Sequence, residues 1–437
     1  MPVPIVPESA PTRGRDVPPR SVLVVGAGLA GLRTAAELRA QGFTGRLTVV
    51  GAEDRAPYDR PPLSKELFTR TEPLWLAEEG YGDLGELADR VLLGRRARRL
   101  EADGTRARVT LAPAGPPAGT RTGAEETVEA DVVVLAVGAA AARPSSWDHA
   151  LTLHGADDAA RLRGLLVPGA RLVVVGAGWI GAEVAGQAAL HGCEVTVVEA
   201  APTPLHRQVG AAAGALTAPW YAAAGVDLRC GRAVTAVRPD AVVLAASARE
   251  PAEEVAADVV LAATGVRPAT AWLAGAVPLT GQGAVPVDAA GRVRGGPPSV
   301  RAVGDCAEMT TPTFGTVPGG HWDAALSHPA ALAAGLLGRP APPTPVPYVF
   351  STQLGHDLTL VGQPPADDDV EVVLRGDVTA GFTVLYLRPG HRLAAGLTAD
   401  RPRDVAALRR LLAAGSDPAL DVGRASDPEV PLRRAVR

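Results

Sequence analysis

The chain has 437 residues, of which 47% are hydrophobic and 21% charged, and this composition is enough for several compact units with buried cores. A formal net charge of −4 gives no overall basic field, so nucleic acid is not expected as a partner. No segment approaches the roughly 20 uninterrupted apolar residues of a membrane-spanning helix, so we expect no membrane partner either. Residues 1–20 contain six prolines and lack the apolar core of a signal peptide, which predicts a disordered leader and a cytoplasmic protein.

Two similar strand, turn and helix units follow, 150 residues apart. Residues 22–32, VLVVGAGLAGL, read as an apolar strand that breaks into glycines and then into a helical pattern continuing to about Ala40. The second unit, RLVVVGAGWIGAEVA, covers residues 171–185. A short strand follows each helix, at 47–50 and 194–198, as a parallel βαβ unit requires.

Later segments complete both halves and add a tail. Apolar strands that end in Gly138 and Gly265 (131–138 and 258–265) follow the two units, so the halves look duplicated, and both glycines are candidate cofactor-binding residues. Pro- and Gly-rich stretches predict a hairpin-like excursion at 112–119, a loop at 295–298 and a boundary at 339–347. The tail after that boundary predicts an antiparallel sheet and one helix, with elements at 358–361, 370–374, 382–387 and 403–414.

Both units carry G-x-G-x-x-G. Its first glycine permits a tight turn, its second lets backbone approach a pyrophosphate, and its third lets the helix pack on the strand. An acidic residue after the next strand accepts hydrogen bonds from ribose hydroxyls. These positions hold Gly26, Gly28, Gly31 and Glu53 in the first unit, and Gly176, Gly178, Gly181 and Glu199 in the second. The sequence therefore predicts two dinucleotide sites.

The acid in the second unit favours NADH over NADPH. A carboxylate at Glu199 accepts from a free 2′-hydroxyl but repels a 2′-phosphate by about 4 kcal/mol at 4 Å and moderate dielectric. Ala200 and Ala201 offer no guanidinium for a phosphate, and Arg207 reaches one only if its loop folds back.

The numbers and positions of lysine, cysteine and histidine limit the kinds of catalytic site that we expect. Lys65 is the only lysine beside 42 arginines, which indicates a position where a flexible ammonium is needed. The three cysteines are widely spaced, so no redox-active dithiol is expected. The eight histidines show no metal-binding spacing, so we expect no catalytic metal.

Several motifs occur together in one order, and they carry a family resemblance. They are PYDRPPLSK (57–65), the two glycine motifs, LAATGVRP (261–268), RAVGDCA (301–307) and GHW (320–322). The chain resembles the oxygenase-coupled ferredoxin reductases, FAD-dependent pyridine nucleotide oxidoreductases of the putidaredoxin and rubredoxin reductase type. The likeness runs from about residue 21 to the end, where RPRD (401–404) and DPEVPLRR (427–434) also match.

The resemblance implies an α/β fold like that of glutathione reductase, with two Rossmann-like dinucleotide-binding domains and a C-terminal α+β domain. The implied division is a leader (1–20), an FAD-binding domain (21–143 and 268–335), an NAD-binding domain (144–267) and the C-terminal domain (336–437).

Specific site residues follow from the same resemblance. Arg60 and Lys65 are expected beside the flavin ring, and Glu183 is expected to pair with Lys65 near flavin N5, the alternative being a plain surface ion pair. Asp305 is expected to accept from the ribityl chain of FAD, or else to cap a helix. The other implied cofactor-binding residues are Trp179, which alternatively only packs its helix, Ile180, Gly304, His321, also a possible proton donor, and Trp322.

The implied function is an NADH-dependent, FAD-containing oxidoreductase, a monomer or homodimer, that passes hydride to FAD and then single electrons to a small acidic iron–sulfur ferredoxin serving an oxygenase. One alternative sends the electrons to oxygen, a quinone or another small acceptor. A second alternative is a flavoprotein that senses NADH through conformation.

The chain departs from the family pattern at a few positions, and most of these departures concern the electron acceptor. Val137 replaces a threonine near the first crossover, and Gly320 replaces a glutamate before the His-Trp pair. The remaining departures are Ser327, His328, Pro329, Phe350 and Thr352.

Overall fold

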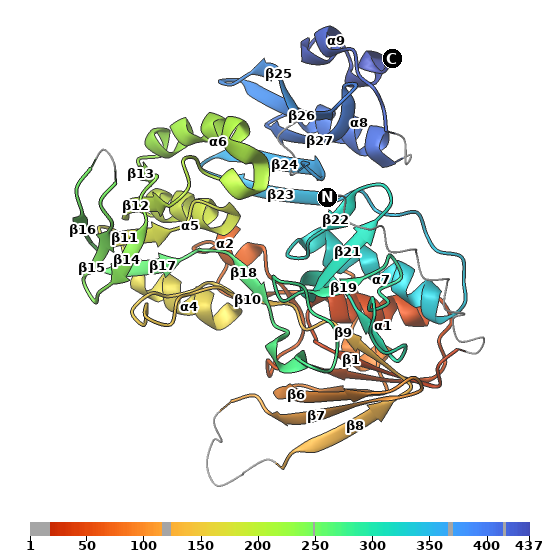
Figure 1. Ribbon diagram of the computed structural model, residues 1–437. Coiled ribbons are helices and arrows are strands. Elements are labelled where there is room, and N and C mark those ends of the chain that lie inside the picture. The colour runs from red at the N-terminus through yellow and green to blue at the C-terminus, as the bar shows by residue number, and fades with distance from the viewer. Residues whose placement is uncertain (1–17, 116–123, 248–249, 366–369, 414–416) are drawn as a thin grey trace, which may run out of the picture.

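The computed structural model describes residues 18–115, 124–247, 250–365, 370–413 and 417–437 (Figure 1). Most of the expected leader, residues 1–17, lies outside the described residues, and so do residues 116–119 of the expected excursion. None of the helices in the described ranges combines the length and apolarity needed to cross a membrane.

A five-stranded parallel sheet forms the centre of the first α/β unit. Its strand order is β20 (Val300–Ala302), β9 (Val132–Leu135), β1 (Ser21–Val25), β2 (Arg46–Val50) and β5 (Arg90–Leu92). Helices α1 (Leu29–Ala40) and α7 (Trp322–Leu336) pack together on one face. The other face meets the antiparallel strands β6 (Arg95–Ala102), β7 (Ala107–Pro113) and β8 (Glu126–Ala130).

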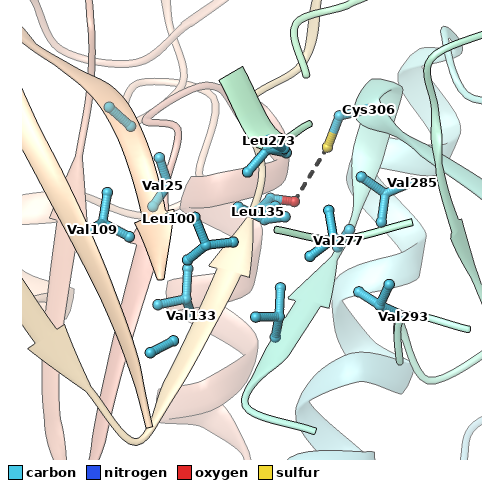
Figure 2. Packing of buried hydrophobic residues seen from close by; sticks show 14 of the residues in the cluster. Val25, Leu100, Val109, Val133, Leu135, Leu273, Val277, Val285, Val293 and Cys306 are labelled. Carbon is cyan, nitrogen blue, oxygen red and sulfur yellow. Dashed lines mark hydrogen bonds between the residues drawn. The ribbon is translucent and has the colours of Figure 1, made fainter. Parts of the chain in front are cut away.

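The central strands β1 and β9 are almost entirely apolar because both faces of the sheet are covered. Leu23 and Val25 point into the core shared with the antiparallel strands, whereas Val22 and Val24 point toward the helices. Figure 2 shows the first of these cores, where the thiol of Cys306 donates to the carbonyl of Leu135.

Short elements surround the sheet. They are β3 (Tyr58–Asp59), α2 (Pro62–Lys65), β4 (Leu74–Trp75), α3 (Leu84–Leu87), the 3-10 turns η1 (Ala271–Leu273) and η2 (Gly304–Cys306), and the strands β19 (Val285–Val287), β21 (Ala307–Thr311) and β22 (Gly315–Val317).

The second α/β unit has a four-stranded parallel sheet, in the order β13 (Asp227–Cys230), β12 (Glu194–Glu199), β11 (Arg171–Val175) and β17 (Val259–Ala262). Its other elements are α4 (Ala156–Leu165), α5 (Trp179–Leu190), α6 (His206–Ala223) and the antiparallel β14 (Val234–Val237), β15 (Ala241–Leu244) and β16 (Glu253–Ala256). The chain crosses between the units at β10 (Ala139–Ala141) and β18 (Val266–Pro268), which pair antiparallel.

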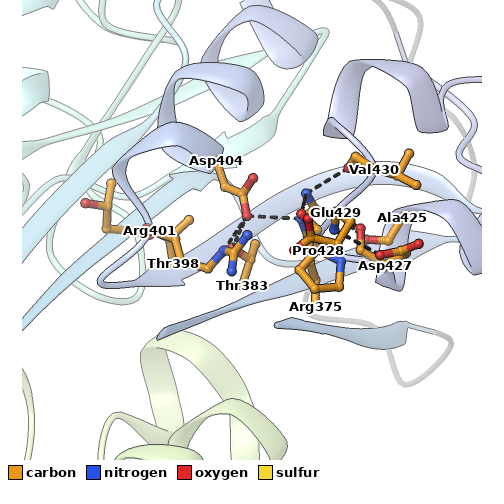
Figure 3. A network of polar contacts seen from close by, with 11 residues as sticks. Arg375, Thr383, Thr398, Arg401, Asp404, Ala425, Asp427, Pro428, Glu429 and Val430 are labelled. Carbon is orange, nitrogen blue, oxygen red and sulfur yellow. Dashed lines mark hydrogen bonds and ion pairs between the residues drawn. The ribbon is translucent and has the colours of Figure 1, made fainter. Parts of the chain in front are cut away.

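The C-terminal unit is a five-stranded antiparallel sheet with helices. The strand order is β23 (Tyr348–Gln353), β24 (His356–Gly362), β27 (Arg392–Ala399), β26 (Gly381–Arg388) and β25 (Glu371–Asp377), and the helices are α8 (Pro402–Ala413), α9 (Val422–Ser426) and η3 (Leu432–Ala435). A buried arginine network joins β25, α8 and the last segment (Figure 3). The predicted α/β fold class with an added α+β domain is confirmed.

The C-terminal sheet packs against the second unit, and this contact positions one of its strands in the site. Val209 and Trp220 of α6 share a core with Leu358 and Phe382 of the sheet. Strand β23 contacts both α5 and α7, so it lies where the three units meet.

Candidate functional site

The two glycine turns have the geometry that binding a pyrophosphate requires. Gly26 has φ +122° and a Cβ there would lie 1.9 Å from the Ala136 carbonyl oxygen, while a Cβ on Gly31 would lie 1.8 Å from the Gly26 oxygen. A Cβ on Gly28, in contrast, would meet no atom within 4 Å. The first and third glycines are therefore needed for packing, and the second leaves its side open.

The second turn repeats this division. A Cβ on Gly176 would lie 2.4 Å from the Ala263 oxygen, and one on Gly181 would lie 2.0 Å from the Gly176 oxygen. Next to Gly178 the nearest atom is the side-chain amide nitrogen of Gln208, at 3.5 Å. Both turns lead into the N-termini of α1 and α5, capped by Gly28 and Gly178, and the first N–H groups of a helix have no partner within that helix.

Alanine substitutions should separate the two kinds of glycine. We expect Gly28→Ala to fold with nearly unchanged stability but to bind its dinucleotide at least tenfold more weakly, because the methyl group occupies only the open side. Gly31→Ala should fail to give folded protein, since its methyl group collides with backbone. Circular dichroism and cofactor titration measure both effects, and a well-folded Gly31→Ala protein would contradict the assignment.

The acid of the first unit belongs to a cluster with the Pro-Pro motif. Glu53 accepts from the Tyr58 hydroxyl at 2.7 Å and from the Arg60 guanidinium at 2.6 Å. Arg60 also donates to the carbonyl of His154. Burial raises the pKa of Tyr58 to about 12, so its hydroxyl stays a donor at neutral pH. The structure thus joins Arg60 to Glu53, while Lys65 lies in a separate cluster.

Glu199 is fixed by backbone at the end of β12. One carboxylate oxygen accepts from the Ala177 N–H, inside the glycine turn, and the other accepts from the Ala201 N–H, each at 2.8 Å. The carboxylate therefore lies directly beside the turn. Arg207 is exposed in the first turn of α6.

A buried ion pair links the Pro-Pro motif to the second unit. Lys65 Nζ lies 2.5 Å from Glu183 Oε1, and the two side chains are 18% and 3% exposed. Ser64 donates to Glu183 Oε2 at 2.5 Å, and Ser351 of β23 donates to Oε1. The pair that the resemblance implies is therefore present and buried rather than on the surface.

Aromatic rings border this pair. Nζ of Lys65 lies 5.1 Å from the ring centre of Phe350, and that ring meets Trp322 edge-on, with 6.0 Å between centroids. The Trp322 indole N–H donates to Asp59 at 2.7 Å. Burial raises the pKa of Asp59, and this hydrogen bond opposes that shift. Phe350 thus lies beside the ammonium of Lys65, and Trp322 packs against Phe350.

Asp305 lies in η2, next to α1. Gly304 has φ +73°, and a Cβ there would lie 2.8 Å from the Ala30 side chain, so the turn approaches α1 closely. Burial raises the pKa of Asp305, while a hydrogen bond from the Gly320 N–H and the charge of Arg60 lower it. The structure places the carboxylate in a turn rather than at the cap of a long helix.

The N-terminus of α5 offers further ligand-facing groups. The Trp179 indole packs toward the α6 core, and its buried Nε1 has no partner among the described residues. Ile180 is 38% exposed although it is apolar. Gly138 and Gly265 have positive φ and open space where a Cβ would stand. An unpaired donor, an exposed apolar side chain and open backbone fit the edges of a bound dinucleotide.

Two histidines and an aspartate line a small cavity at the N-terminal half of α7, together with Phe314 and Tyr348. Burial lowers the pKa of His321, and it lowers that of His328 to about 4, so both rings are neutral at physiological pH. Burial raises the pKa of Asp323. The substitution His328 is therefore accommodated as a half-buried, neutral ring.

Sequence reasoning missed several residues that contact the ion pair, its aromatic neighbours or, for Gln353, a partner of the pair. Asp59 and Ser64 stand inside the Pro-Pro motif, which was the only available signal for them. Ser351 and Gln353 arrive on β23 from the C-terminal unit, and nothing in the local sequence points to Glu183. All four are found only once the units are folded together.

Two glycine turns with open second positions, each followed by an acid after the next strand, and a buried ion pair between the two units define an oxidoreductase built for two dinucleotides. Residues 20–328 match the family model described as pyridine nucleotide-disulphide oxidoreductase, and residues 348–436 match the reductase C-terminal model. The chain belongs to the pyridine nucleotide-disulphide oxidoreductase family.

Named relatives and a solved structure extend this likeness over nearly the whole chain. The chain is 32% identical to the ferredoxin–NAD(+) reductase component of an anthranilate 1,2-dioxygenase system from Burkholderia cepacia, covering 94% of this chain and 98% of that protein. It is 33% identical to the ferredoxin reductase component of a chlorobenzene dioxygenase from Cupriavidus sp. strain PS12, covering 95% and 97%. The crystal structure of a covalent putidaredoxin reductase–putidaredoxin complex matches with a TM-score of 0.82 and 26% identity, covering 95% and 98%. The family resemblance predicted from the motifs is confirmed.

Proposed function

We propose that this protein transfers a hydride from NADH to a bound FAD and then delivers single electrons to a small acidic iron–sulfur ferredoxin that serves an oxygenase. The observation that carries the proposal is the buried Lys65–Glu183 pair, which joins the two dinucleotide units at one point. The relatives named as ferredoxin reductase components of dioxygenases support the choice of acceptor. The three cysteines are all free, which is consistent with a hydride and electron carrier rather than a dithiol relay.

The two units divide the cofactors between them in this proposal. FAD lies on the turn at Gly26, with Glu53 at its adenosine ribose and Asp305 at its ribityl chain, and NADH lies on the turn at Gly176 with Glu199 at its ribose. The domain boundaries expected from the sequence belong to the same assignment. A cytoplasmic location also belongs to it, since unpaired cysteines persist in reducing compartments.

FAD, when bound, supplies the chemistry of accepting a hydride and releasing electrons one at a time. The protein supplies charge and order. Lys65 keeps a positive charge in a nearly buried position, where it stabilises negative charge more strongly than it would in water. Glu183 holds the ammonium at one place, and the Phe350 ring, against which Trp322 packs, lies beside it.

Stopped-flow reduction of the purified protein, followed by reoxidation with and without a two-iron ferredoxin, tests the proposal. We expect flavin to co-purify, NADH to bleach it much faster than NADPH does, and ferredoxin to reoxidise it faster than air does. A protein that takes up no flavin would contradict the cofactor assignment. Reduction by NADH without any effect of ferredoxin would instead favour a small-molecule acceptor or an NADH sensor.

Glu199 should set the preference for NADH. Replacing it with glutamine should reduce the ratio of kcat/KM for NADH over NADPH by one to two orders of magnitude, because the repulsion of a 2′-phosphate disappears. Steady-state reduction of an artificial dye measures this ratio. Glu194→Gln, at the exposed start of the same strand, is the matched control. An unchanged ratio in Glu199→Gln would show that another residue selects the cofactor.

A further inference from the structure

Glu183 receives hydrogen bonds from two other units of the fold. Lys65 Nζ and Ser351 Oγ both contact Oε1, while Ser64 Oγ contacts Oε2. Lys65 and Ser64 belong to the Pro-Pro motif of the first unit, and Ser351 belongs to β23 of the C-terminal unit. Glu183 itself is in α5 of the second unit, so its carboxylate accepts hydrogen bonds from both the first unit and the C-terminal unit.

Ser351 is itself oriented by a buried neighbour. The amide of Gln353 donates to Ser351 Oγ at 3.0 Å, and the two residues are 1% and 2% exposed, respectively. Because the serine oxygen accepts from Gln353, its own proton is directed to Glu183. Thr352, between them, is exposed and donates instead to Asp357 at 2.8 Å. Side chains of β23 thus alternate, with Ser351 and Gln353 pointing into the interior and Thr352 pointing to the surface.

We propose that Ser351, oriented by Gln353, is a positioning residue of the hydride-transfer site, acting through Glu183 to hold the ammonium of Lys65. The C-terminal unit is then part of the catalytic apparatus. This inference rests on the proposed function, because it concerns reduction of the flavin by NADH. It adds to that function a dependence on a residue some 290 positions away from Lys65 in the chain.

Ser351 matters because the side chain of Lys65 is flexible, while its ammonium has to stay at one position. Lys65 is tethered by four methylene groups, and Glu183 can rotate its carboxylate when only one oxygen is tied. Hydrogen bonds to a carboxylate are charge-assisted and strong, and two hydroxyls on different oxygens fix both its direction and its rotation. Without the Ser351 hydroxyl, Oε1 of Glu183 is contacted only by Lys65, and the ammonium of Lys65 can move more freely.

The sole lysine of the chain makes this testable directly. In protein grown with 13C-lysine, the ε-methylene of Lys65 gives the only lysine signal, and a fixed side chain shows two distinct Hε shifts. We expect two shifts in the wild type, in Ser351→Thr, which retains the hydroxyl, and in Thr352→Ala, the surface control. We expect them to merge in Ser351→Ala and Ser351→Cys, which lack a strong donor. Ser351→Cys preserves volume and carries the test if Ser351→Ala does not fold.

The rate of flavin reduction should follow the same order. The limiting rate with NADH should fall about tenfold in Ser351→Ala and Ser351→Cys, the size of loss expected for one charge-assisted hydrogen bond. The NADH concentration for half the limiting rate should change less than twofold. Two distinct Hε shifts together with a wild-type rate in both variants would overturn the inference. If NADH fails to reduce even the wild type, the proposed function fails, while the lysine signal still decides whether Ser351 positions Lys65.

Discussion

Replacing Glu183 with glutamine should slow reduction of the flavin by NADH by about two to three orders of magnitude. The side chain of Glu183 is 3% exposed and faces three donors, namely Lys65, Ser64 and Ser351. A glutamine presents one NH2 group to these donors, so at least one of them loses its acceptor. The ammonium of Lys65 also loses its counter-charge in a nearly buried position, which disfavours the charged form and its orientation.

Stopped-flow reduction under anaerobic conditions measures this effect, and two further variants define its cause. Asp258→Asn removes a carboxylate from an exposed ion pair with Arg171, whose side chains are 44% and 46% exposed, and should leave the rate unchanged. Lys65→Arg keeps the charge but replaces a compact ammonium by a planar fork, and should also slow reduction at least tenfold. Wild-type rates in Glu183→Gln would reduce the pair to a structural contact.

Repeated local patterns allowed much of the fold to be predicted from the sequence. The strands at β1 and β11 differ from the predicted ones by at most a residue, because continuous apolar runs that break into glycine have few other structures. Strand β27 was missed because RLAAGLTA is rich in alanine and glycine, which have low strand propensity. Strand β23 was missed because its polar Ser351 and Gln353 point into a buried network.

The site was predictable only as far as short motifs reach. The glycine turns are local, so the role of each glycine follows from its spacing. The direction of a long side chain, in contrast, depends on partners that are distant in the sequence. Arg60 was expected beside the flavin ring with Lys65, and the structure directs its guanidinium to Glu53 and the His154 carbonyl. Its placement at the flavin stays a prediction.

The departures in α7 concern packing as well as the acceptor. Pro329 lies inside the helix, where it lacks an N–H, and the helix nevertheless continues to Leu336. Two residues before it, Ser327 donates its hydroxyl to the Asp323 carbonyl at 2.7 Å. His328 lines the cavity next to Tyr348 as a neutral ring. These substitutions therefore lie in the wall between the first unit and β23.

Replacing Arg375 with lysine should destabilise the C-terminal unit by about 3–5 kcal/mol. Its guanidinium is 2% exposed and donates to Asp404 at 3.0 Å and to the backbone carbonyls of four residues in the last segment (Figure 3). Those carbonyls belong to Ala425, Asp427, Pro428 and Val430. A lysine has three donors on one nitrogen and cannot reach acceptors on opposite sides, so buried carbonyls and a carboxylate lose their partners.

Urea unfolding, followed by a spectroscopic signal that reports on the C-terminal unit, measures this loss. The control is Arg392→Lys, in an exposed pair with Asp417, which should change the free energy of unfolding by less than about 1 kcal/mol.

The loss of stability in Arg375→Lys should also depend on pH. Burial acts to raise the pKa of Asp404, but hydrogen bonds from Arg375 and Arg401 outweigh it, and the net pKa lies below its usual value. A carboxylate with a lowered pKa in the folded state contributes stability above its unfolded pKa and loses it as the pH falls through the folded value. The difference between wild type and Arg375→Lys should therefore be constant above about pH 5 and shrink below about pH 4. A difference that does not change down to pH 3 would show that the carbonyl contacts alone stabilise this segment.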